Sequence, residues 1–283
     1  MIQLIVESGA TKAEWTLTAG SDIRQRFKTG GLNFSSGDPA YLEKTLREAL
    51  KALEAAPQQI HFYAAGLFPS DAADSPYKRL ESLLKGAFPE AECFLENDLL
   101  AAARALCGHG EGIAAILGTG SNACRYDGSQ IVRKTASGGF ILGDEGSASA
   151  LGRCFIADWI KGLVPEEVKN SFTEQDLSYP SVVQAVYRGA SPSAWLGAFA
   201  PTLLQHYATS EYVHHLVDAN FEAFLRRCLL PLGAGEGLPV SVTGSFGCAC
   251  QPILSALGAS FGIRFARFLP APSEALIAYH TAL

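Results

Sequence analysis

The 283-residue sequence lacks the marks of several large protein classes. It contains no run of lysine and arginine, and its formal net charge is −6, so we expect neither nucleic acids nor anionic membranes as partners. No apolar stretch reaches the ~18–20 residues that a membrane helix needs. Met1 leads directly into a strand-like segment, so we expect no leader peptide.

Cysteine is present, but not as the framework of a secreted domain. The seven cysteines are odd in number and irregularly spaced, which predicts a reducing cytoplasmic environment. Cys248 and Cys250 form the one close pair. Because no second pair and no histidines stand at metal-binding spacing, we expect small apolar packing there rather than a zinc site.

The sequence does contain enough apolar residues for a substantial core. Hydrophobic residues make up 48% of the chain and charged residues 18%, which is typical of a soluble globular protein. The length suits two domains of roughly 150 residues each.

The first hundred residues predict the order strand, strand, strand, helix, strand, helix, strand, helix. Apolar runs predict the strands 2–6, 14–18, 23–28, 60–64 and 92–95. Glu7–Lys12 is predicted as the turn between the first two strands. Helices are predicted to begin at Asp38-Pro39, Ser75-Pro76 and Asn97-Asp98, because each pair begins with an N-cap residue and two of them continue with proline.

The second half begins in the same way. Strands are predicted at 113–117, 123–126 and 131–134, and later at 240–243 and 262–265. Helices are predicted at 147–161, at 252–257 and from Ser273, and a mainly helical region spans about 164–230, where Pro201 should break or kink one helix.

A glycine turn follows the first strand of each half. The turns are Gly9-Ala10-Thr11 and Gly118-Thr119-Gly120. Such turns can point several backbone N–H groups in one direction and bind phosphate, although an ordinary glycine hairpin is the alternative. The repetition predicts a duplicated fold with a nucleotide clamped between its two halves.

Taken in order, these residues resemble the N-acetylglucosamine kinase and BadF-type ATPase family, within the sugar kinase, Hsp70 and actin superfamily. The most specific pieces are Leu-Gly-Thr-Gly-Ser-Asn at 117–122 and Gly-Phe-Ile-Leu-Gly-Asp-Glu-Gly-Ser at 139–147. Residues 7–11 precede them and Gly244-Ser245 follows. The resemblance covers essentially the whole chain.

The resemblance implies an α/β fold of two domains, the duplicated ribonuclease H-like fold of sugar kinases, Hsp70 and actin. Nucleotide and substrate would bind in the interdomain cleft. The first domain would span residues 1–108 and include the C-terminal helix 272–283. The second would span 109–271, with a helical insertion around 164–230 that either covers the sugar side or forms a dimer surface.

The resemblance also implies two phosphate loops for ATP and a turn for its adenosine. The residues are Gly9, Ala10, Thr11 and Lys12 in the first loop, Gly118, Thr119 and Gly120 in the second, and Gly244 and Ser245 in the adenosine turn. Thr11 and Thr119 would donate their hydroxyls to phosphate oxygens. The alternative for Thr11 is a turn hydroxyl that bonds to its own backbone.

Two carboxylates take the central roles that the resemblance implies. Asp98 would be the general base that accepts the proton of the sugar hydroxyl, although aspartate is also a favoured N-cap; Asn97 could supply that cap instead. Glu7 stands where the family usually has an aspartate that holds Mg²⁺ through water. Glutamate keeps the charge and adds a methylene, and the alternative is a solvated carboxylate at the strand end.

The sugar contacts that the resemblance implies come from both halves of the chain. They are Asn33, Ser121, Asn122, Gly138, Gly139 and Asp144. Asn33 could equally be a turn asparagine, and Asp144 could instead cap a helix that begins at Glu145.

The implied activity is an ATP- and Mg²⁺-dependent kinase for a small amino sugar, with the 6-hydroxyl of N-acetylglucosamine favoured over glucosamine, N-acetylmannosamine and N-acetylmuramic acid. A homodimer is one assembly it permits. Two alternatives share the fold. A BadF-type activator ATPase would hold an iron–sulfur cluster between subunits, but no suitable cysteine pair is visible. A non-catalytic sugar sensor would carry a DNA-binding domain ahead of the first strand.

Overall fold

The computed structural model describes residues 1–9, 11–35 and 37–281. It divides into two compact units, one made of Met1–Gly108 with the C-terminal segment from Pro272, the other of His109–Ala271. No helix in the described ranges is long and apolar enough to cross a membrane.

The first unit is built on a five-stranded mixed sheet in the order β3-β2-β1-β4-β5. Its strands are β1 (Ile2–Ser8), β2 (Lys12–Ala19), β3 (Asp22–Gly30), β4 (Gln59–Ala64) and β5 (Glu92–Asn97). β1 pairs antiparallel with β2 and parallel with β4. Glu7 and Ser8 therefore belong to β1 and Lys12 to β2. The predicted turn over Glu7–Lys12 is too long, because ladder pairing continues to Ser8 and Ala13.

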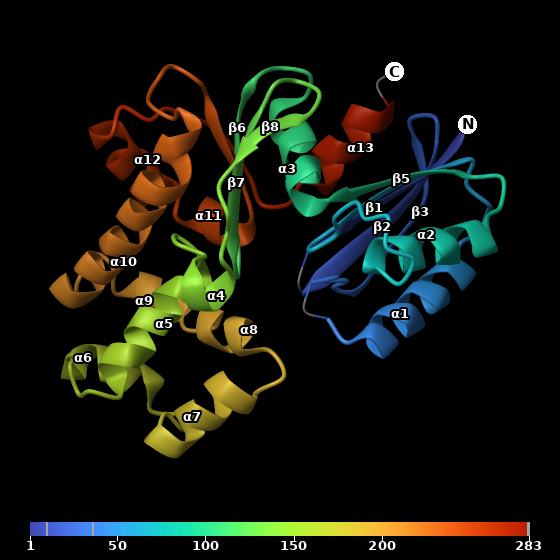
Figure 1. Ribbon diagram of the computed structural model, residues 1–283. Coiled ribbons are helices and arrows are strands. Elements are labelled where there is room, and N and C mark those ends of the chain that lie inside the picture. The colour runs from blue at the N-terminus through green and yellow to red at the C-terminus, as the bar shows by residue number, and fades with distance from the viewer. Residues whose placement is uncertain (10, 36, 282–283) are drawn as a thin grey trace. The chain divides into compact units, whose positions relative to one another are not determined.

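Four helices cover this sheet: α1 (Pro39–Lys51), α2 (Pro76–Ala87), α3 (Asp98–Cys107) and α13 (Ser273–Thr281). Figure 1 shows α1 and α2 on one face, where alternate strand residues such as Leu4, Val6 and Phe62 form the core. The predicted helix starts are confirmed, since Asp38 and Ser75 cap α1 and α2 by accepting hydrogen bonds from the backbone three residues on.

The second unit repeats the topology of the first. Its sheet has the order β10-β9-β6-β7-β8, with strands β6 (Gly112–Leu117), β7 (Ser121–Tyr126), β8 (Ile131–Lys134), β9 (Val240–Thr243) and β10 (Phe265–Leu269). As in the first unit, the central strand pairs antiparallel on one side and parallel on the other. The predicted duplication is thus confirmed.

Most of the second unit outside the sheet is helical. The helices are α4 (Gly139–Leu142), α5 (Ala148–Trp159), α6 (Glu166–Lys169), η1 (Asn170–Phe172), α7 (Tyr179–Arg188), α8 (Pro192–Gly197), α9 (Ala200–Gln205), α10 (Glu211–Phe224), η2 (Leu225–Leu229), η3 (Leu230–Leu232), α11 (Ser245–Ala249) and α12 (Gln251–Ser260). Pro201 lies in the first turn of α9 and separates it from α8, as predicted. Their apolar faces meet in one core that includes Leu151, Phe155 and Phe221.

Two predicted elements of this unit are wrong. The strand expected at 262–265 is displaced to β10, because the N–H groups of Gly262 and Ile263 still bond to the last turn of α12. A helix does not open at Glu145. α5 begins at Ala148 and is capped by Ser147, whose hydroxyl accepts from the N–H of Ala150 at 3.1 Å.

Candidate functional site

Two carboxylates lie near each other at the ends of strands in the first unit. Glu7 is near the end of β1, and Asp98 is the first residue of α3, directly after β5. The cap of α3 comes from Asn97, whose side-chain oxygen accepts from the N–H of Leu100 at 2.9 Å. The carboxylate of Asp98 is therefore not needed as that cap and can serve another purpose.

Both carboxyls sit in surroundings that hinder ionisation. Burial raises the pKa of Glu7 to about 7, and the charge of Asp98 adds to the rise, while the Lys12 ammonium opposes it. Burial likewise raises the pKa of Asp98 to about 6, against hydrogen bonds from backbone N–H groups at the start of α3. A carboxylate with a pKa near neutrality is suited to accept a proton in a reaction at that pH.

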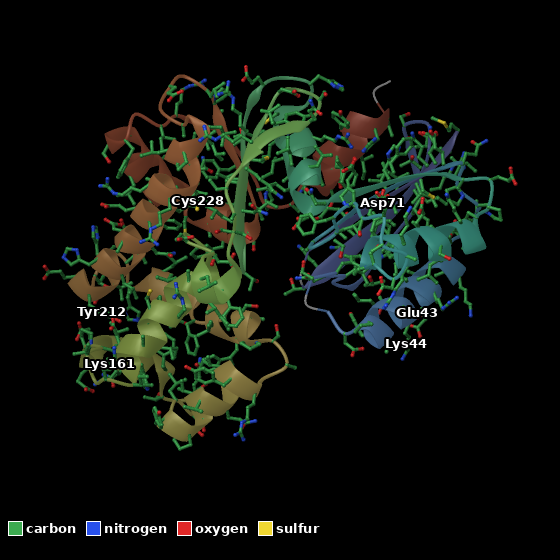
Figure 2. All side chains as sticks on the ribbon, viewed as in Figure 1. Glu43, Lys44, Asp71, Lys161, Tyr212 and Cys228 are labelled. Atoms are coloured by element: carbon green, nitrogen blue, oxygen red, sulfur yellow. The ribbon has the colours of Figure 1, made fainter. Side chains whose placement is uncertain are left out.

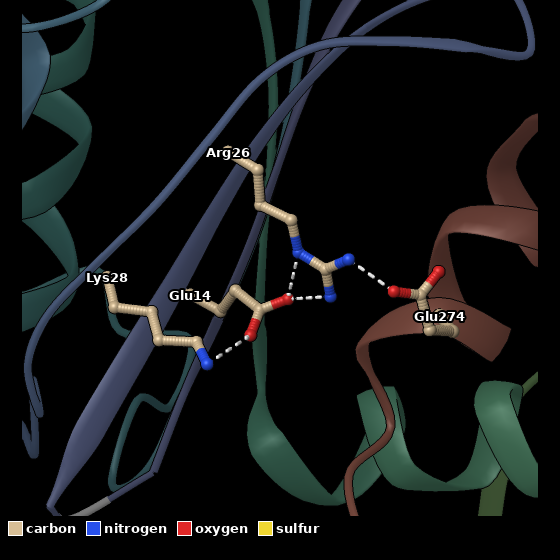
Figure 3. A network of polar contacts seen from close by, with 4 residues as sticks. All are labelled: Glu14, Arg26, Lys28 and Glu274. Atoms are coloured by element: carbon tan, nitrogen blue, oxygen red, sulfur yellow. Dashed lines mark hydrogen bonds and ion pairs between the residues drawn. The ribbon is translucent and has the colours of Figure 1, made fainter.

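A third carboxylate, Glu14, is the cross-strand neighbour of Glu7. Figure 3 shows it bound by two cations, Arg26 and Lys28 of β3. The Nε of Arg26 donates to Oε1 of Glu14 at 2.6 Å, and Nζ of Lys28 lies 3.8 Å from Oε2. Arg26 also donates to Glu274 of α13, a hydrogen bond that raises the pKa of the guanidinium. The negative charge of Glu14 is thus balanced by two neighbouring cations, whereas the charges of Glu7 and Asp98 are balanced less fully.

This arrangement fits a divalent cation that is shared with a phosphate ligand. Among the residues that the structure describes, no group of three or more His, Cys, Asp and Glu side chains surrounds a single ion position. Mg²⁺ usually keeps several waters and binds through one or two carboxylates plus phosphate oxygens. Glu7, partly buried near the end of β1, could supply such a carboxylate.

The first glycine turn is joined to the Asn33 segment by a residue that the sequence did not single out. Ser8 is fully buried, and its hydroxyl accepts from the N–H of Leu32 at 2.8 Å and donates to the carbonyl of Gly9 at 3.3 Å. The N–H of Gly9 donates to the carbonyl of Lys12 at 3.0 Å and closes the turn. Ala10 lies outside the described residues.

Thr11 and Lys12 are exposed beside this turn, where they could meet a ligand. Asn33 takes part in a turn, which was the alternative to a sugar contact, because its side-chain oxygen accepts from the N–H of Ser35 at 2.9 Å. Its two Nδ2 hydrogens and the second lone pair of its oxygen could still contact a sugar. The segment is also held to the end of β4, since the N–H of Phe34 donates to the carbonyl of Ala65 at 2.8 Å.

In the second unit, the Gly118–Gly120 turn rests on the first turn of α5. The carbonyls of Gly118 and Thr119 accept from the N–H groups of Ala148 and Ser149 at 3.0 and 3.1 Å. The N–H groups of Thr119 and Gly120 donate to no residue within the described ranges, and both residues are partly exposed. With the carbonyls turned toward the helix, these two N–H groups are available to an anion.

The adenosine turn predicted at Gly244 packs directly on this second turn. Gly244 has a φ of 121°, and a Cβ there would lie 2.2 Å from the carbonyl oxygen of Leu117. Only glycine allows this approach and this backbone conformation. Ser245, the next residue, begins α11 and is exposed.

Asp144 lies over the same turn. Its carboxylate accepts from the N–H of Ser121 at 3.3 Å, and a Cβ on Gly120 would lie 3.0 Å from its Oδ2. Burial raises the pKa of Asp144. Its φ of 57° is the one positive value of a non-glycine residue in the described ranges. Such a conformation costs energy, so the surroundings must hold it in place.

The remaining predicted sugar contacts line the same part of the second unit. Gly138 and Gly139 both have positive φ and lead into α4, while the N–H of Asp144 returns to the carbonyl of Ser137 at 2.9 Å. Asn122 is on β7, one residue after Ser121. The structure therefore gathers one set of predicted residues at the strand ends of the first unit and a second set around the Gly118–Gly120 turn.

No family model and no curated protein sequence matches the chain. Among solved structures, a Porphyromonas gingivalis protein provisionally named N-acetylglucosamine kinase is 36% identical, with a TM-score of 0.88, over 100% of this chain and 99% of that chain. The chain belongs to this N-acetylglucosamine kinase family.

Two more distant structures show the same fold. One is a Chromobacterium violaceum protein with the same provisional name, 19% identical, with a TM-score of 0.77 over 98% of each chain. The other is a ROK family glucokinase from Streptomyces griseus in complex with glucose and AMPPNP, 16% identical, with a TM-score of 0.57 over 99% of this chain and 98% of that chain. The predicted sugar kinase, Hsp70 and actin-like fold is thus confirmed for this member of the N-acetylglucosamine kinase family. The roles of single residues and the domain limits stay predictions.

Proposed function

We propose that the protein is an ATP-dependent, Mg²⁺-requiring kinase that phosphorylates the 6-hydroxyl of N-acetylglucosamine. The observation that carries the proposal is the full-length similarity of the chain to the N-acetylglucosamine kinase family. The chain also contains the two glycine turns and a partly buried Asp98. The glucokinase with bound glucose and AMPPNP shares the fold and supports ATP as the phosphoryl donor.

In this proposal Asp98 accepts the proton of the sugar 6-hydroxyl. The oxygen of that hydroxyl bonds to the γ-phosphorus as the bond between the γ-phosphorus and the β,γ-bridging oxygen breaks, and ADP leaves. The raised pKa of Asp98, about 6, matches this role, because the group is ionised at neutral pH yet basic enough to take a proton.

The two glycine turns would position the phosphates. The N–H groups of Thr119 and Gly120 would donate to phosphate oxygens, together with the side chains of Thr11 and Lys12. Glu7, beside Asp98, would hold Mg²⁺ through water, and the ion supplies charge neutralisation on the phosphates. The turn at Gly244-Ser245 would leave room for adenosine, because the absent side chain exposes backbone.

The sugar would be held by side chains of both units. Asn33 would contact it from the first unit, and Ser121, Asn122 and Asp144 from the second. A buried carboxylate such as Asp144 can accept hydrogen bonds from two hydroxyls, and Gly138 and Gly139 permit a close approach of the backbone.

A coupled assay of ADP release tests the proposal. The sugars to compare are N-acetylglucosamine, N-acetylmannosamine, glucosamine, N-acetylmuramic acid and glucose. We expect the highest kcat/KM with N-acetylglucosamine, and Asp98→Asn should lower kcat by roughly 10²–10⁴-fold while ATP still binds. If the folded wild-type protein releases no ADP in response to any of these sugars, the kinase assignment is wrong.

A further inference from the structure

One helix of the second unit contacts the Asp144–Ser147 loop. This helix is α10 with its π-helical continuation η2, which lies beside β7 where Figure 2 labels Cys228. The residues that touch the loop are Asn220, Phe224, Arg227 and Cys228, and we call these four the clamp. They belong to the helical region whose role the sequence left open.

Asn220 binds the loop backbone with both ends of its carboxamide. The oxygen accepts from the N–H of Gly146 at 3.1 Å, and Nδ2 donates to the carbonyl of Ser147 at 3.2 Å. The side chain is 9% exposed, so water cannot readily replace these hydrogen bonds. Phe224 packs so tightly that a Cβ on Gly146 would lie 2.6 Å from its own Cβ.

Arg227 and Cys228 bind the next residue of the loop, Glu145. Nη1 of Arg227 donates to Oε1 at 3.2 Å, and the Cys228 thiol lies 3.9 Å from Oε2. Burial raises the pKa of Cys228 to about 12, so the thiol remains a donor. The carboxylate side chain is 17% exposed and the guanidinium side chain 72%. Both residues stand on a π-helical turn, which rotates the residues that follow relative to a regular α-helix and is often found at functional sites.

Ser121, the first residue of β7 directly after the second glycine turn, also binds this loop. The hydroxyl of Ser121 donates to the carbonyl of Glu145 at 2.8 Å, and its N–H donates to Asp144. Asp144, with its left-handed backbone, is thus bound by Ser121, and the three residues that follow it are bound by the clamp. Without the clamp, the hydrogen bonds of Asp144 with Ser121, Ser137 and Ser147 would remain, but those that hold the following residues of the loop to α10 and η2 would be lost.

We propose that Asn220 and Arg227 are positioning residues, which fix the Asp144–Ser147 loop and thereby the sugar-binding carboxylate of Asp144. The inference has a kinetic part, the effect on KM for the sugar, which rests on the proposed function. Its mechanical part, the restraint of the loop backbone, does not rest on that function. Part of the helical region 164–230 thereby has a role: its residues position the loop that carries Asp144 but do not themselves contact the sugar.

The mechanical part is tested by hydrogen exchange of the full-length protein, followed by mass spectrometry of peptides that cover residues 139–148. We expect Asn220→Ala to speed exchange in these peptides by about tenfold or more, since a tenfold change corresponds to ~1.4 kcal/mol and a buried pair of hydrogen bonds is lost. Arg227→Gln should speed it less. Arg226→Gln is the matched control, because Arg226 pairs with Glu222 of its own helix.

The kinetic part separates positioning from general damage. With the sugar as varied substrate, Asn220→Ala should raise KM by about tenfold, leave kcat within about twofold and leave KM for ATP unchanged. Arg227→Gln should raise KM for the sugar by only about two- to fivefold, because the Arg227 side chain is 72% exposed. Arg227→Lys should restore most of the loss. The double variant Glu145→Gln with Arg227→Gln should be less impaired than Arg227→Gln alone, because it removes the unpaired carboxylate.

Two results would overturn the clamp. One is exchange of the 139–148 peptides in Asn220→Ala and Arg227→Gln at the rate of Arg226→Gln. The other is an equal rise of KM for sugar and KM for ATP, together with faster hydrogen exchange across the whole second unit. If the wild-type protein phosphorylates no sugar, the proposed function fails, and the exchange experiment alone still decides whether the clamp fixes the loop.

Discussion

Acid should destabilise the first unit through a pair of stacked histidines, of which His61 is buried and His280 partly buried. His61 of β4 and His280 of α13 stack with ring centroids 3.9 Å apart, and Nε2 of His280 shares a 2.8 Å hydrogen bond with the hydroxyl of Tyr63. Phe94 stacks on His61 at 4.8 Å. The guanidinium of Arg104 lies 5.7 Å from the Tyr63 ring. A proton on either histidine would place a second cation in this confined and already positive cluster.

The size of the effect follows from the two pKa shifts. Burial lowers the pKa of His61 to about 4, helped by Arg104, and burial lowers the pKa of His280 to about 3, helped by His61 and Arg104. Both titrate near 6.5 in the unfolded chain. Because the folded pKa is the lower one, the unfolded chain binds more protons between these values. The free energy of unfolding therefore falls as pH drops below about 6.5.

At pH 5, protonation of each histidine stabilises the unfolded chain by about 2 kcal/mol. The two rings influence each other's titration, so together they should lower the free energy of unfolding by ~2–4 kcal/mol. The double variant His61→Phe with His280→Gln removes the titration. Phe can still stack on Phe94, and Gln can still reach Tyr63. Between pH 7.5 and pH 5 the wild-type chain should lose ~2–4 kcal/mol more stability than this variant.

Urea unfolding followed by the fluorescence of Trp15 measures this difference, in a chain whose Trp159 and Trp195 are replaced by Phe. Trp15 is fully buried in the first unit and reports on it alone. The raised pKa values of Glu7 and Asp98 work in the opposite direction, but both chains share them and they cancel. His215→Gln, at an exposed histidine, is the control. Parallel curves of stability against pH for wild type and double variant would refute the reasoning.

Three further outcomes follow from the site. The rate of sugar phosphorylation should rise with pH through about 6, as Asp98 loses its proton, and a flat profile in this range would remove it as the base. Gly244→Ala should lower stability in urea by ~2–4 kcal/mol and weaken ATP binding, since its Cβ would meet Leu117; Gly162→Ala, at a positive φ of 71° in open space, should lose only ~1 kcal/mol. Ser8→Ala should lower stability by ~1–3 kcal/mol and raise KM for sugar, because the buried N–H of Leu32 loses its acceptor; an unchanged KM would separate Ser8 from the Asn33 segment.

The parts of the fold that local chemistry determines could be predicted from the sequence. Asp38 and Ser75 lie directly before prolines and cap helices with their own side chains, so three or four residues contain the whole signal. The duplicated strand order was visible because each half repeats the same apolar runs and turns. The error at 262–265 also has a local cause: Gly262 follows the end of α12 by two residues, and its N–H still bonds to the carbonyl of Ala259 in the helix, so the strand starts later.

The interactions that hold the candidate site together join residues far apart in the chain, and no local pattern shows them. Arg26 joins Glu14 to Glu274, 248 residues away from Arg26. Asn220 reaches Gly146 across 74 positions. Its place on an amphipathic helix predicts only a face, and the π-helical turn after it, which itself contains no glycine or proline, changes that face.

The family resemblance implies an aspartate at position 7, and the surroundings of Glu7 are compatible with a glutamate there. The cross-strand neighbour Glu14 is matched by Arg26 and Lys28, so it adds little to the negative charge that Glu7 faces. What remains close to Glu7 is the carboxylate of Asp98 and the ammonium of Lys12. A longer side chain then moves the charge by about one bond length, and in the proposed site the ion would be bound through water, whose position can adjust. On this reasoning Glu7→Asp should keep Mg²⁺-dependent turnover within about tenfold, whereas Glu7→Gln, which removes the charge at nearly the same length, should lose far more. Equal losses in the two variants would mean that the length of the side chain matters as much as its charge.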